Sequence, residues 1–317
     1  MKRFKRILYV NEPLAQQQAT LARAASLARN NQATLTLLDV LPEMAAGIGM
    51  SPGGPISQGL MQRLTDERLT VLKTLAAHYT DGKPFTCEVH IGKRFLEVIH
   101  AVQRDNYDLV VKPAENPDWI DRLFGSDDMH LLRKCPVPVW LMHEHEKSNY
   151  GTILAAVGSP PGACDPQEEA LNRHIAALAG SLALSDFAEL HLVHVWESPG
   201  IMLTPWITHP EKMGLELEIA VRQRHQQLLD KVVGDLKTHL GREAWDYLSP
   251  RAHLVQGVPN REIPLLAHEL GADLLVMGTV ARTGIAGLFI GNTAESILDQ
   301  LRCSVLAIKP EGFVSPV

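Results

Sequence analysis

Short apolar runs alternate along the chain with longer segments of helical periodicity, and this order occurs twice. In the first half, the runs predict strands at 7–10, 33–40, 85–91, 109–111 and 137–142, with helices at 15–30, 60–79 and 95–104. In the second half, the predicted strands are 152–157, 189–195, 251–256, 274–277 and 304–308, with helices at 166–183, 214–240, 260–270 and 293–301. Nearly continuous apolar strands that alternate with helices indicate a parallel sheet covered on both faces.

Local sequence features repeat with the same spacing in the two halves. Gly125 lies thirteen positions after Lys112 in the first half, and Gly291 lies thirteen positions after Gly278 in the second. A cysteine precedes the last apolar run of each half. At 317 residues the chain has the length of two domains. We therefore predict an α/β fold with two tandem Rossmann-like, doubly wound domains, each with a five-stranded, mostly parallel sheet.

A polar segment separates the two halves. We place the first domain at 1–144, a linker at 145–150 and the second domain at 151–317. Residues 143–146 read His-Glu-His-Glu and could bind a divalent metal if the segment were extended. The simpler interpretation is a solvated linker, so we predict no metal site.

Composition and charge exclude several classes of function. The hydrophobic fraction is 45% and the net charge is −6 at pH 7, which favours an ordinary globular protein and gives no basic surface for nucleic acid or an anionic membrane. No uncharged apolar stretch is long enough to span a bilayer, and the run at 7–10 is too short for the core of a secretory signal. Cys87, Cys135, Cys164 and Cys303 form no CxxC pair and are expected to be reduced thiols in a cytoplasmic protein.

The second half carries the clearest candidate for chemistry, a glycine-rich loop between a predicted strand and a predicted helix. It runs from Gly278 to Gly291. Glycines let the backbone approach a phosphate closely, and the following helix directs free N–H groups toward an anion. This half could therefore hold a phosphate.

The first half has no comparable loop. Lys112 stands at the position equivalent to Gly278, Glu115 stands at the position equivalent to Ala281, and Asp127 and Asp128 follow Gly125 in the first turn of the helix. Acids at that place stabilise the helix dipole themselves and would repel a phosphate. We predict that the first domain holds no nucleotide.

Several short sequence phrases carry a resemblance to a known family. GTV at 278–280, RTGI at 282–285 and GNTAE at 291–295, together with LLRKCP at 131–136, resemble the universal stress protein family in its tandem-domain form. The resemblance extends over essentially the whole chain. It implies a stress-response protein that acts by binding a small molecule and is not an enzyme, and the sequence contains no evident catalytic set.

The resemblance also implies what the loop would hold. ATP-binding members of the family have the pattern Gly, two residues, Gly, nine residues, Gly, then Ser or Thr. This chain keeps Gly278 and Gly291 but has Ala281 at the middle glycine and Asn292 at the hydroxyl position. We expect Asn292 to cap the following helix, with Glu295 completing a capping box.

ATP-binding members also end their first strand with an aspartate that holds adenine or ribose. Here Gly158 follows the first strand of the second half, and Asn11 follows that of the first. Loss of one charge-assisted hydrogen bond costs about 1.5–3 kcal/mol, or about ten- to a hundredfold in affinity. The resemblance thus implies a weak ATP- or AMP-type site in the second domain only, formed by Val157, Gly158, Val195, Met277, Gly278, Gly291, Asn292 and Thr293.

Two other classes of function stay open. The segments 44–62 and 197–213 contain many apolar residues and follow the second predicted strand of each half, at the edge where α/β sheets bind ligands. They could cover an apolar or amphipathic small molecule, or they pack on the protein itself. A slow hydrolase is the third class, but no base or nucleophile is evident near the glycine loop.

The family resemblance further implies that the two domains pair with each other through their last strands, at 137–142 and 305–309. Such pairing would remove an exposed apolar edge from each sheet. A homodimer of the whole chain stays open.

The remaining histidines and cysteines predict no site. His191 and His194 lie three residues apart on a predicted strand and would face opposite sides of the sheet, so they could not share one ion. Cys135 and Cys303 occupy equivalent places before the last strand of each half. We expect small buried thiols there and no redox chemistry.

Overall fold

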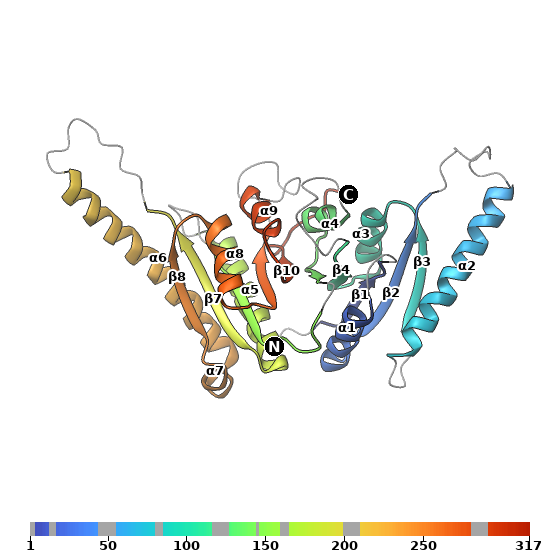
Figure 1. The fold of residues 1–317 in the computed structure, drawn as a ribbon, viewed down its shortest axis with the longest axis horizontal. Helices are drawn as coiled ribbons and strands as arrows, with labels where there is room; N and C mark the ends of the chain where they lie inside the picture. The colour runs from blue at the N-terminus through green and yellow to red at the C-terminus, as the bar shows by residue number, and fades with distance from the viewer. Residues whose placement is uncertain are drawn as a thin grey trace.

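The computed structural model describes residues 4–12, 17–43, 55–79, 85–115, 127–143, 146–158, 165–198, 210–279 and 291–317. Figure 1 shows two halves that meet at the centre of the molecule. The strands of the first half are β1 (Arg6–Val10), β2 (Thr34–Leu41), β3 (Thr86–Ile91), β4 (Leu109–Pro113) and β5 (Val139–Met142). Its helices are α1 (Gln18–Asn31), α2 (Pro55–Ala77), α3 (Arg94–Asp105) and α4 (Asp127–Lys134).

The second half repeats this order with one addition. Its strands are β6 (Thr152–Ala156), β7 (Glu189–Trp196), β8 (Arg251–Gln256), β9 (Leu274–Gly278) and β10 (Ser304–Ile308). Its helices are α5 (Pro166–Asp186), α6 (Pro210–Leu240), α7 (Arg242–Leu248), α8 (Pro259–Glu269) and α9 (Asn292–Leu298). The predicted alternation of strands and helices is confirmed, and the predicted strands match those observed to within two residues at each end.

The short helix α7 was not predicted. Gly241 adopts φ 77°, a left-handed conformation that favours glycine, and this residue separates α6 from α7. Leu248 is the only residue of α7 that is buried. The helix therefore lacks the periodic apolar face on which prediction from sequence depends.

The ten strands of the described residues form a single sheet in the order β3-β2-β1-β4-β5-β10-β9-β6-β7-β8. The prediction of two five-stranded sheets is wrong in this respect, because β5 and β10 hydrogen-bond with each other and join the halves. They run antiparallel, with Leu141 opposite Val305 and Val139 opposite Ala307, while the other neighbouring strands are parallel. The predicted pairing through the last strands is confirmed, and it leaves β3 and β8 as the two edges of the sheet.

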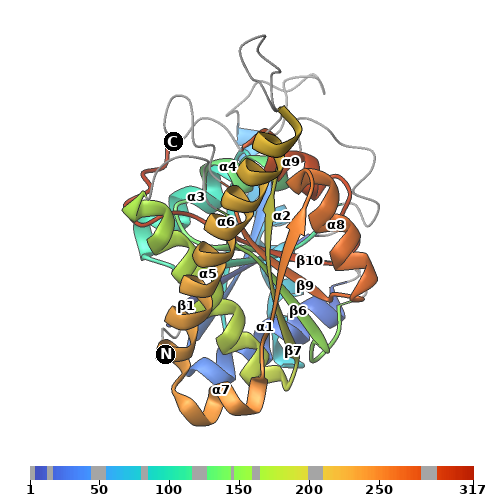
Figure 2. The same cartoon turned by 90° about the vertical axis from the view of Figure 1, so that its left-hand side faces the viewer.

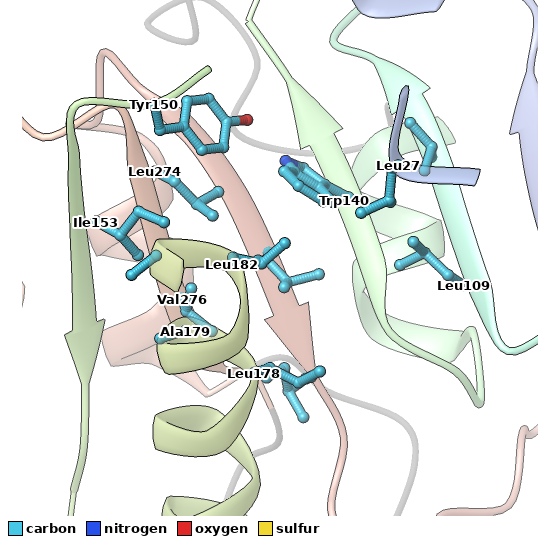
Figure 3. Close-up of a cluster of buried hydrophobic side chains, with 14 of the residues drawn as sticks. Leu27, Leu109, Trp140, Tyr150, Ile153, Leu178, Ala179, Leu182, Leu274 and Val276 are labelled. Carbon is cyan, nitrogen blue, oxygen red and sulfur yellow. The ribbon is translucent and has the colours of Figure 1, made fainter. Parts of the chain in front are cut away.

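Helices cover both faces of the sheet. The apolar side chains of one face pack with α1, α2, α5 and α6, and those of the other face pack with α3, α4, α8 and α9. Figure 2 shows this layering from the side of the second half. At the junction of the halves, Trp140 of β5 is fully buried, and it belongs to one apolar cluster with Leu27 of α1 and with Leu178 and Leu182 of α5 (Figure 3). The two halves therefore share one apolar core on this face.

A buried ion pair next to Trp140 connects the two halves. Arg23 of α1 donates two hydrogen bonds to Asp186 at the end of α5, and both side chains are almost completely buried. The guanidinium of Arg23 lies 4.4 Å from the ring centre of Tyr150 and also donates to the carbonyl of Ser148. Asp186 in turn accepts a hydrogen bond from the backbone N–H of Tyr150. One charged pair thus ties α1, α5 and the segment between the halves together.

That segment is not uniformly solvated. Glu146 is only 8% exposed and accepts hydrogen bonds from the hydroxyls of Tyr150 and Ser304. The interpretation of 143–146 as a solvated linker is therefore wrong for Glu146, because the junction of the halves encloses it, while residues 144 and 145 lie outside the described part.

Among the described helices, none combines the length and the hydropathy needed to cross a lipid bilayer.

Candidate functional site

Each half has a point where the order of its strands reverses, between β1 and β4 and between β6 and β9. Ligands of open α/β sheets bind at the carboxyl ends of the strands at such points. In the second half, Ala156 is in register with Met277, so Val157 and Gly158 come next to Gly278 at this edge. The structure therefore brings together four of the predicted site residues.

The other four predicted residues lie around this group. Val195 is near the end of β7, whose Val193 carbonyl accepts a hydrogen bond from the N–H of Val157. Gly291 donates its N–H to the carbonyl of Thr279 at 3.3 Å, which joins the start of α9 to the end of β9. Asn292 and Thr293 are exposed in the first turn of α9. Residues 280–290, between Thr279 and Gly291, lie outside the described part of the chain.

Helix α5 covers part of this edge, which the sequence did not indicate. Asn172 donates to the carbonyl of Gly158 at 2.6 Å and accepts from its N–H at 3.0 Å. A β-carbon placed on Gly278 would lie 3.0 Å from Leu171 Cδ2, so the absence of a side chain at Gly278 lets Leu171 approach. Gly158 and Gly278 are both still partly exposed.

The start of α9 differs from the prediction. Gly291, with φ −60° and ψ 136°, is the N-cap, and no side chain caps the helix there. Asn292 already belongs to the helix, so its side chain is one residue too late for the predicted capping role. Glu295 forms an ion pair with Arg133 of α4 at 2.7 Å, which connects the two halves in place of the predicted capping box.

A pocket between α5 and α6 opens beside Val157 and Gly158. Asp165, Glu168 and Asn172 line it from α5 and its N-cap, and His194 of β7 is also part of its lining. Because a carbonyl only accepts hydrogen bonds, His194 donates from Nδ1 to the carbonyl of Val157 at 3.0 Å. Its Nε2 then accepts from Nδ1 of His225 at 2.7 Å. The pocket thus combines carboxylates with one histidine, His194, whose ring is held by Val157 and His225.

A second histidine pair lies on the other face of β7. His191 and His253 are hydrogen-bonded at 2.9 Å, with ring planes 15° apart. His191 and His194 therefore have separate partners, as their positions on opposite faces predict. Among the described residues, no group of three or more His, Cys, Asp or Glu side chains has the arrangement of a metal site.

We expect these histidine pairs to make the second half sensitive to acid. Burial lowers the pKa of both His225 and His253, and the nearby Arg224 and His191 act in the same direction. A folded-state pKa below the unfolded value means that stability is present above about pH 6.5 and is lost as the pH falls below it. The melting temperature should decrease by a few degrees between pH 7.5 and 5.5 because of these two residues.

Thermal unfolding of the double variant His225→Gln/His253→Gln checks this expectation. The variant should lose less melting temperature on acidification than the parent protein. A matched variant at the exposed His239, His239→Gln, should behave like the parent. An equal acid response in all three proteins would contradict the role of the pairs.

In the first half, a lysine fills the place that Gly278 has in the second. Lys112 is fully buried, and its Nζ lies 2.7 Å from Asp128 Oδ1 and 3.1 Å from Glu12 Oε2. Arg94 adds a second ion pair to Glu12 at 2.8 Å. Burial, with Asp128 nearby, raises the pKa of Glu115 to about 7. Ion pairs within the protein therefore occupy the edge between β1 and β4.

The cysteine prediction can be assessed for three residues. Cys135 and Cys303 are buried free thiols, and burial raises the pKa of each to about 12, which disfavours the reactive thiolate. The expectation of small buried thiols is confirmed at these two positions. Cys87 is a partly buried free thiol. Cys164 lies outside the described residues.

The predicted apolar segments can be followed only in part. Of 44–62, residues 44–54 lie outside the described part, and 55–62 form the first turns of α2. Of 197–213, residues 199–209 lie outside it, and 210–213 begin α6. An apolar or amphipathic ligand under these segments stays a prediction.

Comparison with known proteins supports the picture given by the fold. The model of the universal stress protein family matches residues 3–143 and 149–309, one match in each half. Universal stress protein E of Salmonella typhi is 30% identical over 325 aligned residues, which cover 100% of this chain and 98% of that protein. Universal stress protein E of Escherichia coli strain K12 has the same identity and coverage.

Solved structures extend this similarity to the three-dimensional fold. A universal stress protein described as putative, from Pseudomonas aeruginosa UCBPP-PA14, superimposes with a TM-score of 0.68 at 26% identity and covers 98% of this chain and 95% of its own. A functionally unknown protein from Pseudomonas aeruginosa PAO1 gives a TM-score of 0.68 at 25% identity, covering 98% of this chain and 94% of its own. Both similarities extend over the two halves.

Proposed function

The chain belongs to the universal stress protein family, and from this premise we propose that it is a cytoplasmic stress-response protein that acts by binding a small molecule and not by catalysis. We propose further that the ligand is a nucleotide of the ATP or AMP type. Its site would be at the carboxyl ends of β6 and β9 in the second half. We infer no resident metal.

The observation that carries this proposal is the difference between the two equivalent edges. Between β1 and β4, Lys112 and its carboxylate partners fill the space. Between β6 and β9, Gly158 and Gly278 are partly exposed, and Gly291 begins a helix within hydrogen-bonding reach of Thr279. Backbone without side chains next to a helix start is the type of surface that admits an anionic group.

The charges around the edge suggest how a nucleotide would be oriented. The pocket beside Val157 carries the carboxylates of Asp165 and Glu168, which would repel phosphate but can accept hydrogen bonds from ribose hydroxyls or a base amine. The phosphates would then lie toward Gly278 and Gly291. Since no aspartate follows β6, we expect weak binding.

Calorimetry with ATP, ADP and AMP at millimolar concentration tests the site. Binding should be detectable in the parent protein and weakened about tenfold or more by Gly291→Asp, because a carboxylate near the phosphates costs on the order of 1–4 kcal/mol. The matched variant Gly59→Asp adds the same charge in α2, where nothing lies within 4 Å of the new side chain's first atom, and should bind like the parent.

Heat signals equal to those of buffer for all three nucleotides would remove the nucleotide from the proposal. Native mass spectrometry of freshly purified protein separates the remaining classes. A co-purified lipid-like mass would favour an apolar or amphipathic ligand, and a nucleotide mass would favour the site proposed here. Phosphate release that Gly291→Asp abolished would show that the protein is an enzyme after all.

A further inference from the structure

Lys309 is a buried amine without a buried acid beside it. Its side chain follows β10, is only 6% exposed, and donates hydrogen bonds to the carbonyl of Leu132 in the first half and to Thr279 Oγ1 at 2.8 Å. Both acceptors are neutral. Among the described residues, no carboxylate lies within ion-pair distance of its Nζ, in contrast to Lys112, which has two such partners near 3 Å.

The surroundings of Lys309 supply little negative charge. Arg133 of α4 and Glu295 of α9 form an ion pair with each other at 2.7 Å. The other charged side chains of α4 have partners of their own, Asp127 with Arg94, Asp128 with Lys112 and Lys134 with the ring of Phe95, and Asp299 at the end of α9 forms no described ion pair with Lys309. The buried thiol of Cys135 follows α4, and the ring centre of Phe313 lies 5.1 Å from Nζ. Thr279 contributes only its hydroxyl, and the nearby strand residues of β5 are apolar. Burial accordingly lowers the pKa of Lys309 to about 7.

The amine of Lys309 is hydrogen-bonded to Thr279, the last described residue before the segment 280–290. Thr279 follows Gly278 directly, accepts from Lys309 through its hydroxyl, and accepts from the N–H of Gly291 through its carbonyl. Thr279 also donates its own hydroxyl to Leu132 at 3.2 Å. Thr279 therefore connects the Lys309 amine to Gly291 at the start of α9, and Leu132 connects the amine to α4 of the first half.

An anion at the carboxyl end of β9, next to Thr279, would supply the negative charge that Lys309 lacks. We propose that Lys309 takes up a proton when an anionic ligand binds beside Thr279, so that binding couples to pH and to the contact with Leu132 in the first half. This inference rests on the proposed function. A positive group in a poorly solvated place is stabilised by a nearby negative one, and by linkage the proton favours the ligand as much as the ligand favours the proton.

The predicted signature is proton uptake on binding, measured by calorimetry with ATP at about pH 8.5 in two buffers of different ionisation enthalpy. At this pH the phosphates of free ATP are already ionised, so they take up no proton of their own. The parent protein should take up about one proton per ATP. Its affinity should rise about tenfold for each unit by which the pH is lowered toward 7.5.

Three variants isolate the source of the proton. Lys309→Met should bind ATP without proton uptake and with an affinity independent of pH in this range. Lys309→Arg keeps the charge at all these pH values and should also bind without uptake, but more tightly than Lys309→Met. Lys73→Met removes an exposed lysine of α2 and should behave like the parent.

The outcomes separate this inference from the proposed function. ATP binding by the parent protein without proton uptake would overturn the role of Lys309 and leave the nucleotide site standing. Uptake that persists in Lys309→Met would assign the proton to another group and overturn it equally. An absence of ATP binding in the parent protein would overturn both.

Discussion

Replacing Asp186 by alanine should lower the free energy of unfolding by about 3–5 kcal/mol, because the change leaves the guanidinium of Arg23 buried without its carboxylate. The two side chains are only 4% and 3% exposed, and they connect α1 to α5 across the junction of the halves. The backbone N–H of Tyr150 would lose its acceptor at the same time. Chemical denaturation followed by circular dichroism measures the loss.

Two further variants show whether the loss comes from the buried charge. Asp246→Ala breaks the exposed pair between Arg242 and Asp246, and should cost less than about 1 kcal/mol. The double change Arg23→Met/Asp186→Leu removes both charges and should cost much less than Asp186→Ala alone. A double variant as unstable as the single one would show that the pair acts mainly through its shape.

Replacing Lys309 by methionine should instead stabilise the protein, by about 2 kcal/mol at pH 7. The folded pKa of about 7 is below the ordinary value of 10.5, a difference that corresponds to at most about 5 kcal/mol. Loss of the hydrogen bonds to Leu132 and Thr279 offsets part of this gain. Leu132 keeps the hydrogen bond from the Thr279 hydroxyl, so its carbonyl does not lose every partner.

The sign of the pH dependence follows from the direction of that shift. Below about pH 10.5 the unfolded chain binds a proton that the folded protein does not, so the lysine lowers stability as the pH falls toward 7. The advantage of Lys309→Met should therefore be largest near pH 7, fall by about 1.4 kcal/mol for each pH unit above it, and reverse before about pH 10.5, where only the loss of the hydrogen bonds remains. Denaturation at several pH values measures it, and a constant advantage would contradict the explanation.

Lys112 provides the matched comparison, since it is a buried lysine of the first half. Its ion pairs with Glu12 and Asp128 hold the charge in place, so Lys112→Met should destabilise the protein where Lys309→Met stabilises it. Destabilisation by both changes would show that hydrogen bonding, and not the charge, determines the contribution of these lysines.

The fold could be predicted from the sequence because its strands are buried on both faces. Continuous apolar runs such as 274–277 reveal central parallel strands, and the repeat of the same order reveals two halves. Only the family resemblance implies that the two sheets join, because no local sequence feature of β5 or β10 indicates that these two strands pair. α7 was missed because a single buried residue, Leu248, gives no periodicity.

Only the part of the candidate site that follows from the order of the strands could be predicted from the sequence. Strand order places Val157 and Gly278 side by side at one edge, as expected. The positions of Leu171 and Asn172 depend on how α5 packs on the sheet, which the sequence does not indicate. The burial of Lys309 depends on its contact with Leu132 of the other half, which the sequence does not indicate either. The side chain of Asn292 suits an N-cap, but the helix begins one residue earlier and Gly291 is the cap.

The antiparallel contact between β5 and β10 lies within one polypeptide, and this has a consequence for how the protein can vary. In a pair of identical subunits, every substitution occurs twice, once on each side of the symmetry axis. Here Lys112 can occur in one copy of the repeat while Gly278 is kept in the other. The covalent link also holds the partners at a high effective concentration, so one copy can specialise as a permanent support without the risk of dissociation.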